Sequence, residues 1–327
     1  MDRPVDFDRD RQMLCERCGH GWTVTLEWIE RWDESKEACP GCGVTCEAED
    51  APRVTVDPDD AALIDEAVPG LFWYHTSTHS DWPRRTIDPA ARLTPTTRMM
   101  MGGEERVAAW AERQKAKALH VGTYEAAIHN MLRRIDDQGD EGQQFYLYRV
   151  RLRPDVSVRP GWLIDPSNFV GDVELAEVCP PGVDVARYLN YHEDPGGLSL
   201  ALGRTAIAST QRIAIPLEGP PASWAIDAAA QIEAATAPAS TPSPDSGRPR
   251  KRYEPSPQSQ RADQVARAVA ERLPANLGRH FRAAAAFGDG ATAAEWAQRV
   301  SGLVQLIMSP AAVLAELDRA EIALVAG

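Results

Sequence analysis

Hydrophobic and polar positions along the chain predict short strands that alternate with helices. Aromatic and β-branched residues dominate residues 72–78, which favours a strand. Residues 144–152 alternate with period two, placing Leu147, Arg149 and Arg151 on the second face of a half-buried strand. Three more segments have strand patterns: residues 118–122, 198–202 and 211–215. Three segments have helical patterns: residues 104–118, 124–136 and 222–236.

The last third of the chain has a different pattern. Residues 237–258 are rich in Ala, Pro and Ser, a composition that cannot bury enough apolar surface to order itself, so we expect a flexible linker over residues 236–258. From residue 260 apolar residues recur at helical spacing, with breaks at Pro274 and Pro310. A helical C-terminal unit is therefore predicted over residues 259–327.

The predicted order of strands and helices indicates an α+β fold with a mixed or antiparallel sheet, not a doubly wound one. Four regions are expected: residues 1–56 around a cysteine cluster, a mixed domain over residues 57–235, the linker, and the helical unit. The chain has 327 residues, which is ample for this organisation.

Composition bears on the environment of the protein. No apolar run approaches the roughly 18–20 residues that a membrane span needs, and the first thirty residues are too acidic for a signal peptide. We therefore expect a cytoplasmic protein without a membrane partner.

The charge of the chain disfavours nucleic acid as a partner. The formal net charge is -13, and residues 1–60 alone carry 16 acidic and 7 basic side chains. Such a field repels phosphate backbones. Residues 246–327 carry 8 acidic and 11 basic side chains and are the one segment that attracts anions.

Four of the six cysteines form two Cys-x-x-Cys pairs, Cys15 with Cys18 and Cys39 with Cys42. Twenty residues separate the pairs, close to the spacing of a structural four-cysteine zinc site. Four thiolates close the coordination shell, so the expected zinc is structural and not catalytic. A disulfide or redox pair is the alternative, and His20 or Cys46 are alternative ligands.

The segment between the two pairs completes a predicted zinc ribbon. Residues 22–28 alternate as a strand does. Because this region is strongly acidic, the ribbon is expected to contact a protein or to have a purely structural role. The ribbon and the C-terminal helices are the expected surfaces for a protein partner.

Three segments of the middle region carry the remaining candidate chemistry. The first is Tyr-His-Thr-Ser at residues 74–77, and the second is Leu-His-Val-Gly-Thr-Tyr-Glu-Ala-Ala at residues 119–127. The third is residues 188–199, in which Glu193 and Asp194 precede a Gly-Gly turn and a predicted strand. Thr123 is placed to cap the helix that begins at Tyr124.

In order and spacing these segments resemble the ADP-ribosyltransferase superfamily over about residues 70–217. That superfamily includes poly-ADP-ribose polymerases, rifampicin-inactivating transferases and transferase domains of phage and toxin proteins. The resemblance implies a split β-sandwich that binds NAD in a cleft between two small sheets, and transfer of ADP-ribose to a protein, a small molecule or water.

The resemblance also implies roles for individual residues. His75 resembles the histidine that contacts ribose hydroxyls, and Glu193 resembles the acid that hydrogen-bonds the nicotinamide ribose. His120 occupies the position of an aromatic residue that stacks on nicotinamide, which is a departure from the family pattern. The implied NAD contacts are Thr76, Gly122, Thr123, Tyr124, Asn190 and Ser199.

The chemistry of these residues is compatible with that assignment. Cleavage of the nicotinamide glycosidic bond develops oxocarbenium character, which a carboxylate from Glu193 or Asp194 would stabilise. No G-x-G-x-x-G or G-x-x-x-x-G-K-[ST] motif is present, so neither a Rossmann nor a P-loop mode of binding is expected.

Other interpretations stay open at this point. His75, His120 and Glu193 can each be ordinary strand or loop residues, and His75 with His79 can be a second metal pair. The whole middle region can be a degenerate transferase fold in a non-catalytic zinc-ribbon adaptor. A nucleic-acid-binding zinc ribbon is the third interpretation.

Overall fold

The computed structural model describes residues 1–83, 88–140, 142–164, 173–235, 255–288 and 290–325. It is a mixed α+β protein with 41% helix and 19% strand, arranged around several sheets. Contacts divide it into two compact units. The first contains residues 1–127, 147–212 and 319–327, and the second contains residues 128–146 and 213–318. The four consecutive regions expected from the sequence remain a prediction.

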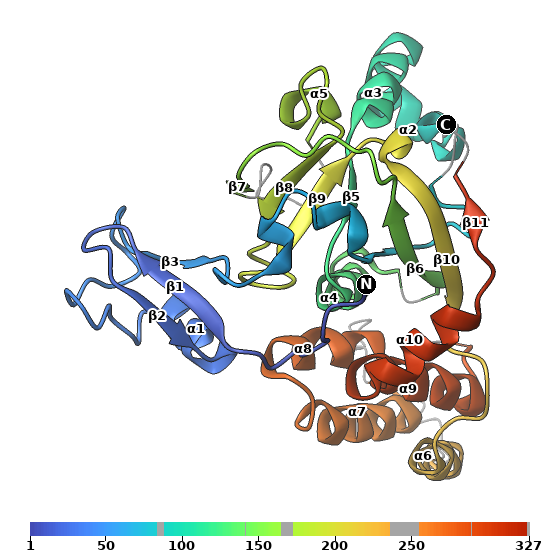
Figure 1. Ribbon diagram of the computed structural model, residues 1–327. Coiled ribbons are helices and arrows are strands. Elements are labelled where there is room, and N and C mark those ends of the chain that lie inside the picture. The colour runs from blue at the N-terminus through green and yellow to red at the C-terminus, as the bar shows by residue number, and fades with distance from the viewer. Residues whose placement is uncertain (84–87, 141, 165–172, 236–254, 289, 326–327) are drawn as a thin grey trace. The chain divides into compact units, whose positions relative to one another are not determined.

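The N-terminal segment folds as a three-stranded antiparallel sheet with one helix (Figure 1). Its strands are β1 (Arg11–Cys15), β2 (Gly21–Val24) and β3 (Pro52–Thr55), in the order β2-β1-β3. Between β2 and β3 lies α1 (Leu26–Asp33). The strand predicted over residues 22–28 is therefore wrong beyond Val24.

The physical reason is the cap at Thr25. Its hydroxyl accepts a hydrogen bond from the Trp28 backbone N–H at 3.2 Å, which starts α1. Leu26, Ile29 and Trp32 then recur at helical spacing and are all buried. The alternation of residues 22–28 was too short to exclude a helix.

Two four-stranded sheets form the middle of the chain. One has the order β11-β10-β6-β4 and the other β5-β9-β8-β7. The strands of the first sheet are β4 (Trp73–Ser77), β6 (Phe145–Leu152), β10 (Ile207–Ile215) and β11 (Ala323–Leu324). Those of the second are β5 (Leu119–Val121), β7 (Leu163–Ile164), β8 (Val185–Leu189) and β9 (Leu198–Leu202).

An isolated antiparallel bridge joins the two sheets. Tyr74 of β4 and Gly122, just after β5, exchange both backbone hydrogen bonds at 2.9 Å. Within the second sheet β9 pairs antiparallel with both β5 and β8, whereas β7 and β8 are parallel. The sheet is therefore mixed, as the order of predicted elements indicated.

Helices and short turns connect these strands. The helices of this part are α2 (Pro95–Met100), α3 (Glu104–Ala116), α4 (Tyr124–Gln138) and α5 (Leu175–Val178). The 3-10 turns are Ala61–Leu63, Val68–Gly70, Pro89–Arg92 and Arg204–Ala206. Most predicted elements agree with these bounds to within two or three residues, but β7, β8, α2 and α5 were not predicted.

Buried arginines explain two differences between the structure and the sequence prediction: the burial of Arg149 in β6 and the presence of β8. Arg149 of β6 was placed on the second face of a half-buried strand, yet it is 2% exposed and donates to the Gln211 side chain. Arg187 of β8 is also 2% exposed and donates to the backbone oxygens of Ala62 and Leu63. A guanidinium group that is hydrogen-bonded to protein oxygens can be buried, so a strand position occupied by arginine can lie in the core.

The second unit contains most of the helical residues. Its helices are α6 (Ser223–Ala234), α7 (Pro257–Ala270), α8 (Ala275–Ala284), α9 (Ala293–Met308) and α10 (Pro310–Arg319). Trp296, Val300, Leu303 and Leu306 of α9 are all buried, as their spacing predicted. The indole N–H of Trp296 donates to the Ala285 carbonyl at 2.7 Å.

The expected linker and tail differ from the structure in two places, and most of the linker is not tested. Residues 236–254 lie outside the described residues. Helix α7 begins at Pro257, inside the range expected for the linker, because the Ser256 hydroxyl caps it through the Ser259 N–H at 3.0 Å. Near its end the described region forms strand β11 where a helix was expected, and Ile322, just before that strand, is 57% exposed.

Within the described ranges no single helix is long and apolar enough to cross a membrane; α9 and α10 pass that test only as a pair bent by 100°.

Candidate functional site

The four cysteines of the two pairs come together at one end of the N-terminal sheet. Cys15 ends β1, Cys18 follows in the turn to β2, and Cys39 and Cys42 lie in the loop after α1. Their four sulfur atoms all lie within 4.8 Å of one another. The described residues contain no other such group of three or more potential ligands, and neither His75 nor His79 belongs to one.

The distances between the sulfur atoms fit one tetrahedral ion. Sγ of Cys15 lies 3.8 Å from Sγ of Cys42, and Sγ of Cys18 lies 3.8 Å from Sγ of Cys39. Thiolates about 2.3 Å from one zinc ion are about 3.8 Å apart in a tetrahedron. Sulfur atoms at this distance are not disulfide-bonded. The four thiols can therefore hold a metal ion such as zinc.

Two matching turns present the thiols. The Gly19 N–H donates to the Cys15 carbonyl at 2.9 Å, and the Gly43 N–H donates to the Cys39 carbonyl at 2.8 Å. Both glycines have left-handed backbone angles, φ +69° and φ +74°, which other residues rarely adopt. Each Cys-x-x-Cys pair thus folds back on itself by the same geometry.

Backbone hydrogen bonds favour the thiolate of Cys39 but not of every cysteine in the group, because burial and neighbouring thiols outweigh them at Cys18 and Cys42 and raise those two pKa values. Burial opposes ionisation of Cys39, but hydrogen bonds from the Cys42 and Gly41 backbone outweigh it and lower its pKa to about 7. Cys46 lies outside the group, with its sulfur 3.1 Å from the Ser35 hydroxyl. His20 is also outside it, and its ring stacks on Trp22.

The three segments of the predicted transferase motif converge where the two sheets meet. The Tyr74–Gly122 bridge joins the first segment to the second. A Cβ atom built on Gly122 would lie 2.8 Å from Oγ of Ser199, so only glycine permits this approach of the second segment to the third. The Thr123 hydroxyl also donates to the Asp194 carboxylate at 2.7 Å.

Asn190 holds the third segment in a tight loop between β8 and β9. Its side-chain oxygen accepts hydrogen bonds from the backbone N–H groups of His192, Glu193 and Asp194, at 2.8–3.1 Å. Its amide nitrogen lies 3.3 Å from Oγ of Ser199. This loop therefore has a fixed shape, in which Glu193 and Asp194 are both buried.

The residues that the resemblance assigned to NAD contact are all near this convergence, and most are buried. Thr76 donates to the Ala127 carbonyl at 3.1 Å. Thr123 caps α4 through the Ala126 N–H, as predicted, and Tyr124 packs edge-on against Tyr74. Exposure is at most 8% for each of these side chains: Thr76, Thr123, Tyr124, Asn190 and Ser199.

The three proposed catalytic residues have different surroundings. His75 of β4 is half-buried, and its ring stacks on Trp82 with centroids 4.2 Å apart. His120 of β5 is half-buried, and its Nδ1 lies 3.0 Å from the Tyr188 hydroxyl. Glu193 is 3% exposed. His75 and His120 thus lie on the two strands that flank the bridge between the sheets.

Sequence reasoning missed the arginines that meet this region. Arg9 and Arg11 both pair with the Asp194 carboxylate, at 2.5 and 3.3 Å, and Arg9 lies 3.5 Å from Glu125. Arg11 is 3% exposed and is the first residue of β1, the strand that ends at the metal-site residue Cys15. No local pattern could reveal this pairing, because 183 residues separate Arg11 from Asp194.

The pKa values of the two buried carboxylates in this network, Asp194 and Glu125, are shifted in opposite directions. Burial disfavours the charged form of Asp194, but the charges of Arg9 and Arg11 outweigh it and lower its pKa. Burial and the charge of Asp194 raise the pKa of Glu125. Asp194 is thus a buried anion that is already matched by cations.

The metal site yields the first prediction. The protein should contain about one zinc ion per chain by elemental analysis, and Cys39→Ser should lose the metal and unfold residues 10–50. Cys46→Ser is the matched control and should keep the metal, since Cys46 lies outside the group. A metal-free preparation that retains the native fold of residues 10–50 would refute the assignment.

The second prediction concerns the buried ion pair. Asp194→Asn leaves Arg11 buried without its counter-ion, so it should lower the free energy of unfolding by about 3–5 kcal/mol in chemical denaturation near pH 7. Asp50→Asn breaks the exposed Arg17–Asp50 pair, which solvent screens, and should change the free energy of unfolding far less. Equal losses in both variants would contradict a structural role for Asp194.

The third prediction is a pH dependence at Glu125. Because the folded-state pKa is above the unfolded one, this carboxyl stabilises the fold when protonated, and that stability is lost as pH rises from about 4 through the raised folded pKa. Glu125→Gln should therefore gain stability relative to wild type over that pH range. Denaturation midpoints measured across the range test this, and parallel curves would contradict it.

Comparison with protein-family models, with curated proteins and with solved structures finds no match.

Proposed function

We propose that the chain is an NAD-dependent ADP-ribosyltransferase or NAD glycohydrolase that carries a structural zinc ribbon. The observation that carries the proposal is the convergence of three segments, far apart in the sequence, at the Tyr74–Gly122 bridge between two small sheets. A split β-sandwich that binds NAD between two small sheets is the arrangement that the sequence resemblance implies. The protein is expected to act in the cytoplasm on a protein, small-molecule or water acceptor.

In this proposal His75 and His120 contact the NAD ribose and nicotinamide from the two strands beside the bridge. The half-buried imidazole of His120, held by the Tyr188 hydroxyl, takes the place of the aromatic ring that stacks on nicotinamide. A ring fixed in this way is pre-organised for a flat ligand group.

Glu193 supplies the negative charge in the proposed reaction. Loss of nicotinamide leaves positive charge on the ribose ring, and a carboxylate in a water-poor site stabilises that charge more strongly than one in water. The Asn190 side-chain oxygen accepts a hydrogen bond from the Glu193 backbone N–H at 2.8 Å, which helps to position the acid. The ion pairs of Asp194 hold the same loop from the other side.

A second candidate is a non-catalytic zinc-ribbon adaptor. It is favoured by the burial of the assigned contact residues, because Thr76, Thr123 and Asn190 make their hydrogen bonds within the protein. Such a network stabilises the fold without any ligand.

The fourth prediction separates these candidates. Zinc-loaded protein incubated with NAD should release nicotinamide, measured by chromatography, and His120→Ala or Glu193→Gln should each slow this release by about 100-fold or more. His192→Ala is the matched control, since His192 is exposed beside Glu193 in the loop, and it should retain the wild-type rate.

Calorimetry with NAD completes the test. A transferase should show binding heat in wild type and in Glu193→Gln, because the amide keeps the shape of the acid. Absence of both binding heat and nicotinamide release, in protein with the wild-type unfolding temperature, would leave the adaptor as the function.

A further inference from the structure

A separate hollow lies on the first of the two middle sheets. It has a volume of about 570 Å³, within the range of small-molecule sites, and is lined by residues from β6, β10, the segment after β4, a 3-10 turn and the C-terminal strand. None of His75, His120 and Glu193 lines it. The lining residues are Ser80, Asp81, Trp82, Pro83, Tyr148, Arg204, Thr210, Arg212, Glu321, Ala323, Leu324 and Val325.

The inner part of the hollow is aromatic and held in place. Trp82 is 8% exposed and Tyr148 is 2% exposed, with ring centroids 5.2 Å apart. The other contact of Trp82 is its stack on His75, and the Tyr148 hydroxyl donates to the His79 carbonyl at 2.6 Å. Rings that are fixed before a ligand arrives lose little entropy when a flat group packs on them.

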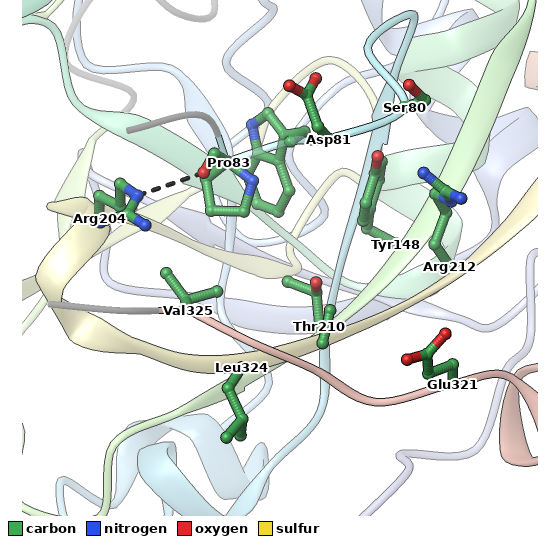
Figure 2. Close-up of a pocket in the computed structure, with 12 residues that line it drawn as sticks. Ser80, Asp81, Pro83, Tyr148, Arg204, Thr210, Arg212, Glu321, Leu324 and Val325 are labelled. Carbon is green, nitrogen blue, oxygen red and sulfur yellow. Dashed lines mark hydrogen bonds between the residues drawn. The ribbon is translucent and has the colours of Figure 1, made fainter. Parts of the chain in front are cut away.

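Cations and anions surround these rings. Figure 2 shows Arg204 beside Pro83 on one side of the hollow and Arg212 on the other, with Asp81 and Glu321 on its margin. The Arg204 Nε donates to the Pro83 carbonyl at 3.2 Å, which holds that guanidinium at the edge of the hollow. Ser80 and Thr210 add hydroxyl groups.

This combination selects one class of ligand. Aromatic rings stack on bases, guanidinium groups pair with phosphate, and carboxylates accept hydrogen bonds from amino and hydroxyl groups. The two carboxylates also balance the two guanidinium groups, so a ligand that is only an anion gains little net attraction. We propose that this hollow binds a nucleotide, with its base against Trp82 and Tyr148 and its phosphate on Arg204 or Arg212.

The C-terminal strand forms one wall of this site. Ala323 and Leu324 of β11 pair with Thr210 and Ser209 of β10, and the Val325 N–H donates to the Ala208 carbonyl at 3.0 Å. The Gln211 side chain also donates to the Ala320 carbonyl at 3.1 Å. A nucleotide in the hollow would therefore contact both β10 and the strand that covers its edge.

None of the three proposed catalytic residues lines the hollow, although Trp82 stacks on His75, so AMP binding is measured separately from transferase activity. AMP is the probe, with adenosine and inorganic phosphate as the two partial ligands. Calorimetry on the zinc-loaded full chain should show AMP binding at least tenfold more tightly than either partial ligand.

The variants assign the binding to this hollow. The double variant Arg204→Gln, Arg212→Gln should weaken AMP binding about tenfold or more and leave adenosine binding little changed. Trp82→Leu should weaken both AMP and adenosine binding about tenfold. The double variant Arg106→Gln, Arg113→Gln removes the same charge from α3 and should bind AMP as wild type does.

Two outcomes would overturn the inference. One is no AMP binding at millimolar concentration, and the other is AMP binding that the Arg204→Gln, Arg212→Gln variant leaves unchanged, which would place AMP elsewhere on the protein. Nicotinamide release from NAD reports on the proposed transferase separately, so failure of one proposal is distinguishable from failure of the other.

Discussion

A carboxylate with almost no exposure to water ties the candidate site to the rest of the first unit. Asp194 accepts from Thr123 at the start of α4 and pairs with Arg9 and Arg11, which lie before and at the start of β1. An uncompensated charge in this position would cost several kcal/mol. The start of α4, the β8–β9 loop and the first strand must therefore assemble together, and the position of Glu193 follows from that assembly.

This ion pair also relates the metal site to the candidate site. Strand β1 has Arg11 at one end and Cys15 at the other, so a single short strand carries both a thiol of the metal site and a counter-ion of Asp194. The loop is held to the ribbon by packing as well, because a Cβ built on Gly196 would lie 3.1 Å from the Thr55 carbonyl of β3. A metal ion held by the four thiols would therefore lie on a strand that also contacts the β8–β9 loop.

The core of this chain uses arginine where many proteins use aliphatic residues. Arg11, Arg149 and Arg187 are each at most 3% exposed, and each has carboxylate, amide or carbonyl oxygens as partners. Five N–H donors in a fixed plane allow one side chain to satisfy several buried oxygens at once. The strands β6 and β8 can therefore be covered on both faces although their sequences contain charged residues.

The sequence by itself determined the features that depend on neighbours along the chain. The two Cys-x-x-Cys turns, the cap of α4 at Thr123 and the apolar face of α9 follow from residues a few positions apart, and the structure has all of them. Local pattern failed at residues 22–28, where a capped helix and a strand were both compatible with so short a segment. Only the tertiary structure decided which acid is neutralised, which arginines are buried and where the hollow beside Trp82 lies. These depend on contacts between distant segments, whose partners no periodicity in the sequence specifies.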